Sequence, residues 1–120
     1  KIGGFDENIF LYYEETDLSR RMKAIGKKTM LIPTIQYKHI HGLSTKKSMA
    51  IKLEQKLSLI YIIQKHQGWL ASRLVLIFFG TKYFFSTILQ PKKWPLLRAS
   101  LQGMPLTLSL KHQQKSKTLE

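Results

Sequence analysis

The spacing of apolar residues changes within the first 26 positions, and this change constrains the fold most. Ile9–Tyr13 is a short, continuous apolar and aromatic run of the kind found in strands. Further on, apolar residues recur at intervals of four and three, as on one face of a helix: Leu18, Met22 and Ile25. Gly26 suits the left-handed position that ends many helices. We therefore expect a strand and then a helix that begins at Glu15 or Thr16.

Two more strand-like segments follow this helix. Thr29–Ile32 is a short run of strand type that Pro33 ends, and Ile35–Tyr37 has the composition of a third short strand. Strands that alternate with a helix are typical of α/β proteins. The expected order over residues 9–37 is therefore a strand, a helix and two more short strands.

The composition changes at about Thr45. Residues 46–67 have the pattern of a basic amphipathic helix, and residues 69–89 form a more apolar segment that contains two cations, Arg73 and Lys82. Prolines interrupt the rest of the chain. We therefore divide the chain into residues 1–45, a helical region over 46–90, and an irregular basic tail over 91–120.

The charge of the chain restricts its partners. There are 20 Lys and Arg against 7 Asp and Glu, which gives a net charge of +13 and favours an anionic partner. The chain has no cysteine, which excludes disulfides and thiolate chemistry.

The basic region over 46–98 has three interpretations. Its helices could pack on their own domain, or they could bind a membrane surface with Trp69, Tyr83 and Trp94 as interfacial anchors. Nucleic acid is disfavoured, because no RNA- or DNA-binding motif is present. A simple transmembrane span is also disfavoured, because each of the two cations in 69–89 would cost about 2.5–3.5 kcal/mol on insertion.

Five of the seven acidic residues fall within twelve positions, from Asp6 to Asp17. Glu14, Glu15 and Asp17 stand at the start of the expected helix. Acids there stabilise the positive end of the helix dipole by about 0.3–1 kcal/mol each. Alternatively, a carboxylate between a strand and a helix, beside aromatic rings, could act as a general base. The residues alone leave both interpretations open.

His39 and His41 form an HxH pair in the loop after the third expected strand. On an extended segment both side chains point to the same side, where they could bind a metal ion. A histidine that is hydrogen-bonded within a loop is the commoner arrangement. The pair by itself therefore does not distinguish a metal site from a structural role in the loop.

The order of the motifs is more specific than any one of them. Over residues 2–45 the chain resembles the carboxyl-terminal half of the catalytic domain of family 2 glycosyltransferases, nearest to the rhamnosyltransferase-like branch. The matching positions are GGFDE at 3–7, FLYYEETDL at 10–18, Arg21, Gly26, Pro33, His39 and Ser44.

This resemblance implies the α/β fold class, as a GT-A (nucleotide-diphospho-sugar transferase) fold followed by helices, and inverting transfer from a nucleotide-sugar donor. It assigns Glu15 as the general base, and Glu14 and Asp17 as residues that orient the base or bind acceptor hydroxyls. It assigns His39 to a divalent cation, Mg²⁺ or Mn²⁺, on the nucleotide diphosphate.

Two features depart from the family pattern. The family usually has Glu-Asp where this chain has Glu14-Glu15, which leaves open which of the two is the base. The Asp-x-Asp motif that holds most of the cation is missing from the 120 residues. We therefore expect a fragment of the enzyme that is inactive in isolation.

The function expected from the resemblance is transfer of a sugar, rhamnose being one candidate, to a glycan or polyprenyl-linked acceptor in cell-surface polysaccharide synthesis. The expected location is the cytoplasmic face of the cell membrane, with peripheral attachment to its anionic surface. The alternative is a non-catalytic basic module that binds membranes, or the remnant of a broken gene.

Overall fold

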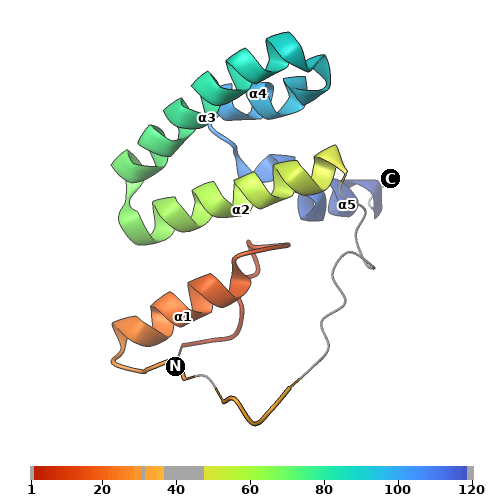
Figure 1. Ribbon diagram of the computed structural model, residues 1–120. Coiled ribbons are helices and arrows are strands. Elements are labelled where there is room, and N and C mark those ends of the chain that lie inside the picture. Colours follow the sequence, from red (N-terminus) through yellow and green to blue (C-terminus); the bar gives the residue numbers. More distant parts are fainter. Residues whose placement is uncertain (1, 31, 37–47, 119–120) are drawn as a thin grey trace.

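The computed structural model describes residues 2–30, 32–36 and 48–118, and the regular elements in these ranges are all helical (Figure 1). In chain order they are α1 (Glu14–Ala24), α2 (Met49–Gln67), α3 (Trp69–Leu89), η1 (Pro91–Lys93), α4 (Trp94–Leu101), η2 (Leu106–Leu108) and α5 (Leu110–Thr118). The helices predicted from Glu15 or Thr16, over 46–67 and over 69–89 are confirmed. Helix α1 begins slightly earlier than predicted, at Glu14, and α2 begins at Met49 with Ser48 as its N-cap.

Helices α2, α3 and α4 form the main packed body. The Ser48 hydroxyl accepts a hydrogen bond from the Ile51 N–H at 3.3 Å and so caps α2. A single residue, Gly68, separates α2 from α3, and its φ of +91° lies in a region that side chains disfavour. Figure 1 shows α3 turning away from α2 at this point and α4 running back along α3.

The hydrophobic core lies between these three helices. Its buried members are Leu57 and Ile60 from α2, Leu76, Phe79 and Tyr83 from α3, Leu96, Leu97 and Ala99 from α4, and Met104 beyond it. Complete burial of one large aliphatic side chain contributes about 1.5–3 kcal/mol. Leu57 is wholly buried at the centre of this set.

The carboxyl-terminal segment forms the helical elements η1, α4, η2 and α5, the last of which ends at Thr118, which corrects the prediction of an irregular tail over 91–120. Prolines begin rather than end its elements: Pro91 starts η1, and Pro95 lies in the first turn of α4. Buried Glu54 of α2 holds the start of α5, because it accepts hydrogen bonds from the Ser109 hydroxyl at 2.8 Å and the Leu110 N–H at 2.9 Å.

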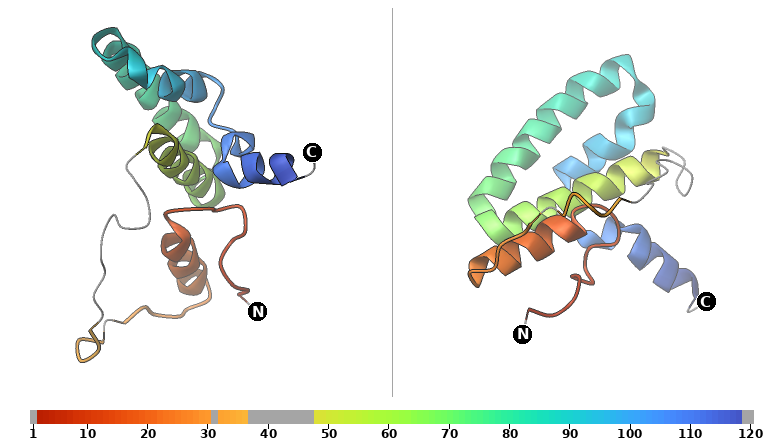
Figure 2. Two further views of the ribbon diagram at one scale, coloured as in Figure 1. Left: turned by 90° about the vertical axis from the view of Figure 1, so that its right-hand side faces the viewer. Right: turned by 60° about the horizontal axis from the view of Figure 1, so that its bottom comes forward.

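Helix α1 lies on the opposite side of α2 from α3 (Figures 1 and 2). Residues 2–13 approach α2 before α1 begins, and two of their contacts fix this approach. Ser58 of α2 donates a hydrogen bond to the Leu11 carbonyl at 2.8 Å, and Lys111 of α5 donates one to the Glu7 carbonyl.

The predicted α/β class, and with it the GT-A fold, is wrong for the described residues, which contain no strand. Within the first expected strand, Tyr12 and Tyr13 have φ of +68° and +69°, which a strand does not adopt. Met30, Ile32 and Ile35 are exposed rather than half-buried. An extended segment becomes a strand only when another backbone pairs with it, and the described residues supply none.

Candidate functional site

Among the described residues, Asp17 is the most enclosed carboxylate, with no exposed surface. Its Oδ2 accepts a hydrogen bond from the Arg21 Nε at 2.7 Å, one helical turn away. Its Oδ1 lies 2.7 Å from the Lys65 Nζ and 2.8 Å from the His66 Nε2, both at the end of α2. One carboxylate therefore joins α1 to α2.

Asp6 extends this network from the segment before α1. Its Oδ2 accepts hydrogen bonds from the Lys65 Nζ at 2.6 Å and the Tyr61 hydroxyl at 2.8 Å. Its Oδ1 accepts from the Asn8 N–H at 2.9 Å, which closes a local turn. Lys65 thus lies between two carboxylates from two parts of the chain.

The Arg21 guanidinium fixes the start of the chain as well. Its Nη1 donates to the Ile2 carbonyl at 2.6 Å, and its Nη2 donates to the Gly4 carbonyl at 2.7 Å. Residues 2–8, α1 and the end of α2 are therefore held by one polar cluster, which we call the Asp17 network: Asp6, Asn8, Asp17, Arg21, Tyr61, Lys65 and His66.

The charges in this network shift the pKa values of its members. Burial opposes ionisation of Asp17, but the hydrogen bonds from Lys65, His66 and Arg21 hold its pKa below the ordinary value. Asp6 has the same balance, and its pKa is well below the usual range. Burial opposes the charge on Lys65 too, but the two carboxylates raise its pKa. All three side chains are therefore ionised near neutral pH.

The three candidate acids of the first turn of α1 lie in different surroundings. Glu15 is exposed, and its side chain forms no hydrogen bond or ion pair with another described residue. Glu14 is partly buried, and its Oε2 is enclosed without a hydrogen-bond partner among the described residues. Asp17 already contacts Arg21, Lys65 and His66 through its two carboxylate oxygens. Of the three, Glu15 is the one that is open to a ligand.

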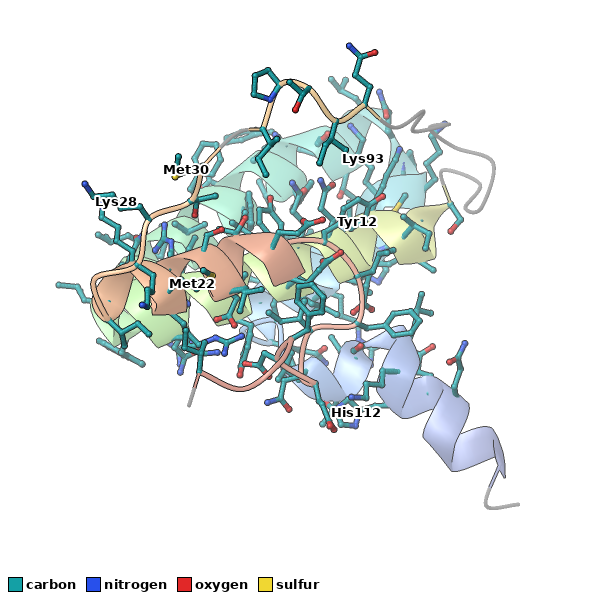
Figure 3. The ribbon with its side chains drawn as sticks, turned by 90° about the horizontal axis from the view of Figure 1, so that it is seen from below. Tyr12, Met22, Lys28, Met30, Lys93 and His112 are labelled. Atoms are coloured by element: carbon teal, nitrogen blue, oxygen red, sulfur yellow. The ribbon has the colours of Figure 1, made fainter. Side chains whose placement is uncertain are left out.

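Glu15 lines a pocket of about 650 Å³ on the face of α1 away from the Asp17 network. The lining residues are Glu15, Thr16, Ser19, Arg20 and Lys23 of α1, and Lys27, Lys28 and Thr29 beyond it. This volume lies within the range of ligand pockets, about 300–1,000 Å³. Figure 3 shows Lys28 at the carboxyl end of α1, where the chain turns back.

The described residues by themselves form no site for a divalent cation. They contain no group of three or more His, Asp or Glu side chains that could hold a metal ion. The oxygens of Asp6 and Asp17 already accept hydrogen bonds from cationic or neutral donors. His39, the residue expected to bind the cation, lies outside the described residues, as does His41, and we derive no step through a metal.

Sequence reasoning missed the basic half of the Asp17 network. Lys65 and His66 are 48 and 49 positions from Asp17, and nothing in a single sequence pairs them. One signal was available for Arg21, because an acid and a base at i and i+4 in a helix commonly pair. The exposed Glu15 and the basic residues after it were visible, but their meeting at one pocket required the turn at Gly26.

Comparison with known proteins places the chain beside glycosyltransferases. Over 71 residues, or 58% of this chain, it is 32% identical to N-acetylglucosaminyl-diphospho-decaprenol L-rhamnosyltransferase of Mycobacterium tuberculosis, in strains CDC 1551 and H37Rv. The matched part amounts to 23% of the length of these relatives. No protein-family model matches the chain, and no solved structure matches it significantly.

Proposed function

We propose that the chain is part of an inverting glycosyltransferase of family 2 in which Glu15 is the general base. The observation that supports this most is the similarity over 71 residues to a rhamnosyltransferase. The name of that relative describes an acceptor sugar joined through a diphosphate to a polyprenol. A polyprenyl-linked acceptor, a nucleotide-sugar donor and a role in cell-surface polysaccharide synthesis are therefore proposed for this chain.

The exposure of Glu15 favours it over Glu14 as the base. A general base must come within about 2.6–3.2 Å of the oxygen whose proton it takes. Glu15 lies at an open pocket, whereas one oxygen of Glu14 is enclosed. Glu14 and Asp17 remain predicted to orient the base or bind acceptor hydroxyls. The burial of Asp17 fits the orienting role, since it holds α1 in place.

The proposed step is a single displacement. The acceptor hydroxyl oxygen attacks the anomeric carbon of the donor sugar, and the bond between that carbon and the phosphate oxygen breaks. The nucleoside diphosphate takes the bonding electrons, Glu15 takes the hydroxyl proton, and the configuration at the anomeric carbon inverts. The divalent cation, and His39 as its ligand, remain predictions.

The test is Glu15→Gln in the whole gene product that contains this chain. We expect kcat to fall by about 10²–10⁴-fold, the usual contribution of general base catalysis, with little change in KM. Glu14→Gln is the matched control in the neighbouring position and should reduce kcat far less. Transfer that survives Glu15→Gln, or that Glu14→Gln abolishes instead, would contradict the assignment of the base.

The surface of α3 supports a second proposal, peripheral binding to the anionic cytoplasmic face of a membrane. Among the described residues, one helix, α3, is long and apolar enough to cross a membrane by length and composition alone, and 22% of its most apolar window is buried. Its exposed large apolar side chains are Trp69, Leu70, Leu74, Ile77, Phe78, Phe84, Phe85, Ile88 and Leu89. A surface of this kind marks an interaction site.

Cations lie among these apolar side chains. The Arg73 guanidinium lies 5.3 Å from the centre of the Trp69 ring, and the Lys82 ammonium lies 5.9 Å from that of Phe78. Apolar side chains interspersed with cations suit an anionic interface better than a bilayer centre. The same surface would serve the alternative function, a non-catalytic membrane-binding module.

Vesicle sedimentation tests the membrane proposal. We expect the chain to bind vesicles with anionic lipid, to bind neutral vesicles and RNA weakly, and to lose binding by about tenfold or more in Ile77→Ser/Phe84→Ser. The matched control is Met30→Ser/Ile32→Ser, which removes two exposed apolar side chains elsewhere. Equal loss in both variants would show that α3 is not the membrane surface.

A further inference from the structure

The pocket beside Glu15 has an unusual concentration of positive charge. Four cationic side chains line it, Arg20, Lys23, Lys27 and Lys28, against one carboxylate, that of Glu15. The hydroxyls of Thr16, Ser19 and Thr29 add further hydrogen-bond donors. Its lining therefore offers donors and positive charge, which are the groups that bind phosphate.

A defined turn brings the two halves of this pocket together. The Lys27 N–H donates to the Met22 carbonyl at 3.0 Å, and the Gly26 N–H donates to the Lys23 carbonyl at 3.0 Å. These two bonds, with Gly26 at φ +76°, form a Schellman motif that ends α1. The motif reverses the chain, so Lys27, Lys28 and Thr29 lie against the face formed by Thr16, Ser19 and Lys23.

The four cationic side chains of the pocket have no partner among the described residues. The side chains of Arg20, Lys23, Lys27 and Lys28 form no hydrogen bond or ion pair with another described residue. By contrast, the neighbouring Arg21 makes three hydrogen bonds in the Asp17 network. The two adjacent arginines of α1 therefore have different roles: Arg21 stabilises the fold, and Arg20 lines the pocket.

We propose that this pocket binds a diphosphate group, with Arg20, Lys23, Lys27 and Lys28 as its ligands. Two adjacent phosphates offer several anionic oxygens, which several cations can bind at once. Arginine can hold one phosphate through two parallel bonds, while lysines act as point charges. A volume of about 650 Å³ also leaves room for a sugar attached to the diphosphate.

The position of Glu15 in the same pocket links diphosphate binding to the proposed sugar transfer. Cations that hold the diphosphate of a lipid-linked acceptor would present the attached sugar to the Glu15 carboxylate, which lines the same pocket. The diphosphate of the nucleotide-sugar donor is the other source of the same chemistry. The choice between the acceptor and the donor as the source of the diphosphate rests on the proposed function. The proposal that the pocket binds a diphosphate does not, because it rests on the lining residues and their charges.

The first experiment maps binding on the unmodified chain. Inorganic pyrophosphate is titrated into the ¹⁵N-labelled protein and the amide shifts are followed by NMR. We expect saturable shifts at residues 15–29, weaker shifts with orthophosphate, and an affinity that falls as salt is raised. No saturable shift at residues 15–29 would overturn the proposal.

Paired variants then separate a specific site from general charge. Lys27→Gln/Lys28→Gln should weaken pyrophosphate binding by about tenfold or more, because two charge-assisted contacts are lost. Lys52→Gln/Lys92→Gln removes the same net charge from outside the pocket and should leave the affinity within about twofold. Equal loss in both variants would show that pyrophosphate responds only to the net charge, and the site would be rejected.

Two further ligands identify the source of the diphosphate. Tighter binding of a short-chain prenyl-diphospho-N-acetylglucosamine than of uridine diphosphate supports a diphosphate site for the acceptor, and the reverse order supports one for the donor. None of these measurements needs sugar transfer. If pyrophosphate does not bind, the Glu15→Gln experiment can still show whether Glu15 is the general base. If Glu15→Gln leaves kcat unaffected, the measured binding of pyrophosphate is still valid.

Discussion

Helix α2 is packed by different chemistry on its two sides. Toward α3 and α4 it presents Leu57 and Ile60, which are buried among aliphatic and aromatic side chains. Toward α1 it presents Tyr61, Lys65 and His66, which bind the carboxylates of Asp6 and Asp17. The interface of α2 with α3 and α4 therefore depends mainly on the burial of apolar side chains, and its interface with α1 depends mainly on ion pairs and hydrogen bonds.

The difference predicts how each part responds to change. An apolar interface loses stability when volume is removed, and it is nearly independent of pH. A network of ion pairs depends on the charge of every member, because removal of one partner leaves the others desolvated and unpaired. Helix α1, with the pocket on its far face, should therefore detach under conditions that leave α2, α3 and α4 folded.

The largest loss of stability is expected from a substitution in the apolar interface of α2. Leu57→Ala should lower the free energy of unfolding by about 3–4 kcal/mol, because it leaves a cavity where the side chain is wholly buried. Urea denaturation followed by circular dichroism measures this. Leu70→Ala, at a side chain 65% exposed on α3, is the matched control and should change stability by about 0.5 kcal/mol or less. Similar losses in the two variants would argue against the core described above.

A smaller effect is expected on the polar side. Asp17→Asn should cost about 2–3 kcal/mol, because Arg21, Lys65 and His66 lose their shared carboxylate while remaining partly in contact with water. Hydrogen exchange should show the loss in the amides of α1, with those of α3 unchanged. Glu15→Gln removes the same charge from the exposed face of the same helix and should alter exchange in α1 far less, by no more than the contribution of about 0.3–1 kcal/mol from an acid in the first turn. Loss of protection in α3 would show that the two interfaces are not independent.

The helices could be predicted from the sequence because their signals are local. The spacing of Leu18, Met22 and Ile25, with Gly26 after them, predicted α1 to within two residues of its observed start and end. The strands could not be predicted correctly, because a run such as Ile9–Tyr13 favours extended backbone without showing that a partner strand is present. The two tyrosines instead adopt positive φ to turn the chain into α1.

The candidate site was predictable in part for the same reason. The sequence showed that acids gather around Glu15, but it assigned Glu14, Glu15 and Asp17 to one shared site. Which of them is buried depends on contacts between α1 and α2, such as that of Asp17 with Lys65 across 48 positions. Long-range pairing of this kind has no periodic signature, so the helix was predicted and its orientation was not.

The smallest effect is expected from acid, which changes the charges of the polar side without changing a residue. The pKa values of Asp6 and Asp17 are lower in the folded protein than the ordinary value of about 3.9. Their contribution to stability is therefore complete above that value and falls as pH decreases toward the folded pKa. Between pH 6 and pH 3 the polar side should lose about 1–2 kcal/mol. Protection factors from hydrogen exchange should fall in α1 and stay constant in α3, and Asp17→Asn should remove much of the pH dependence. An equal fall in both helices would mean that acid acts on the whole fold rather than on the Asp17 network.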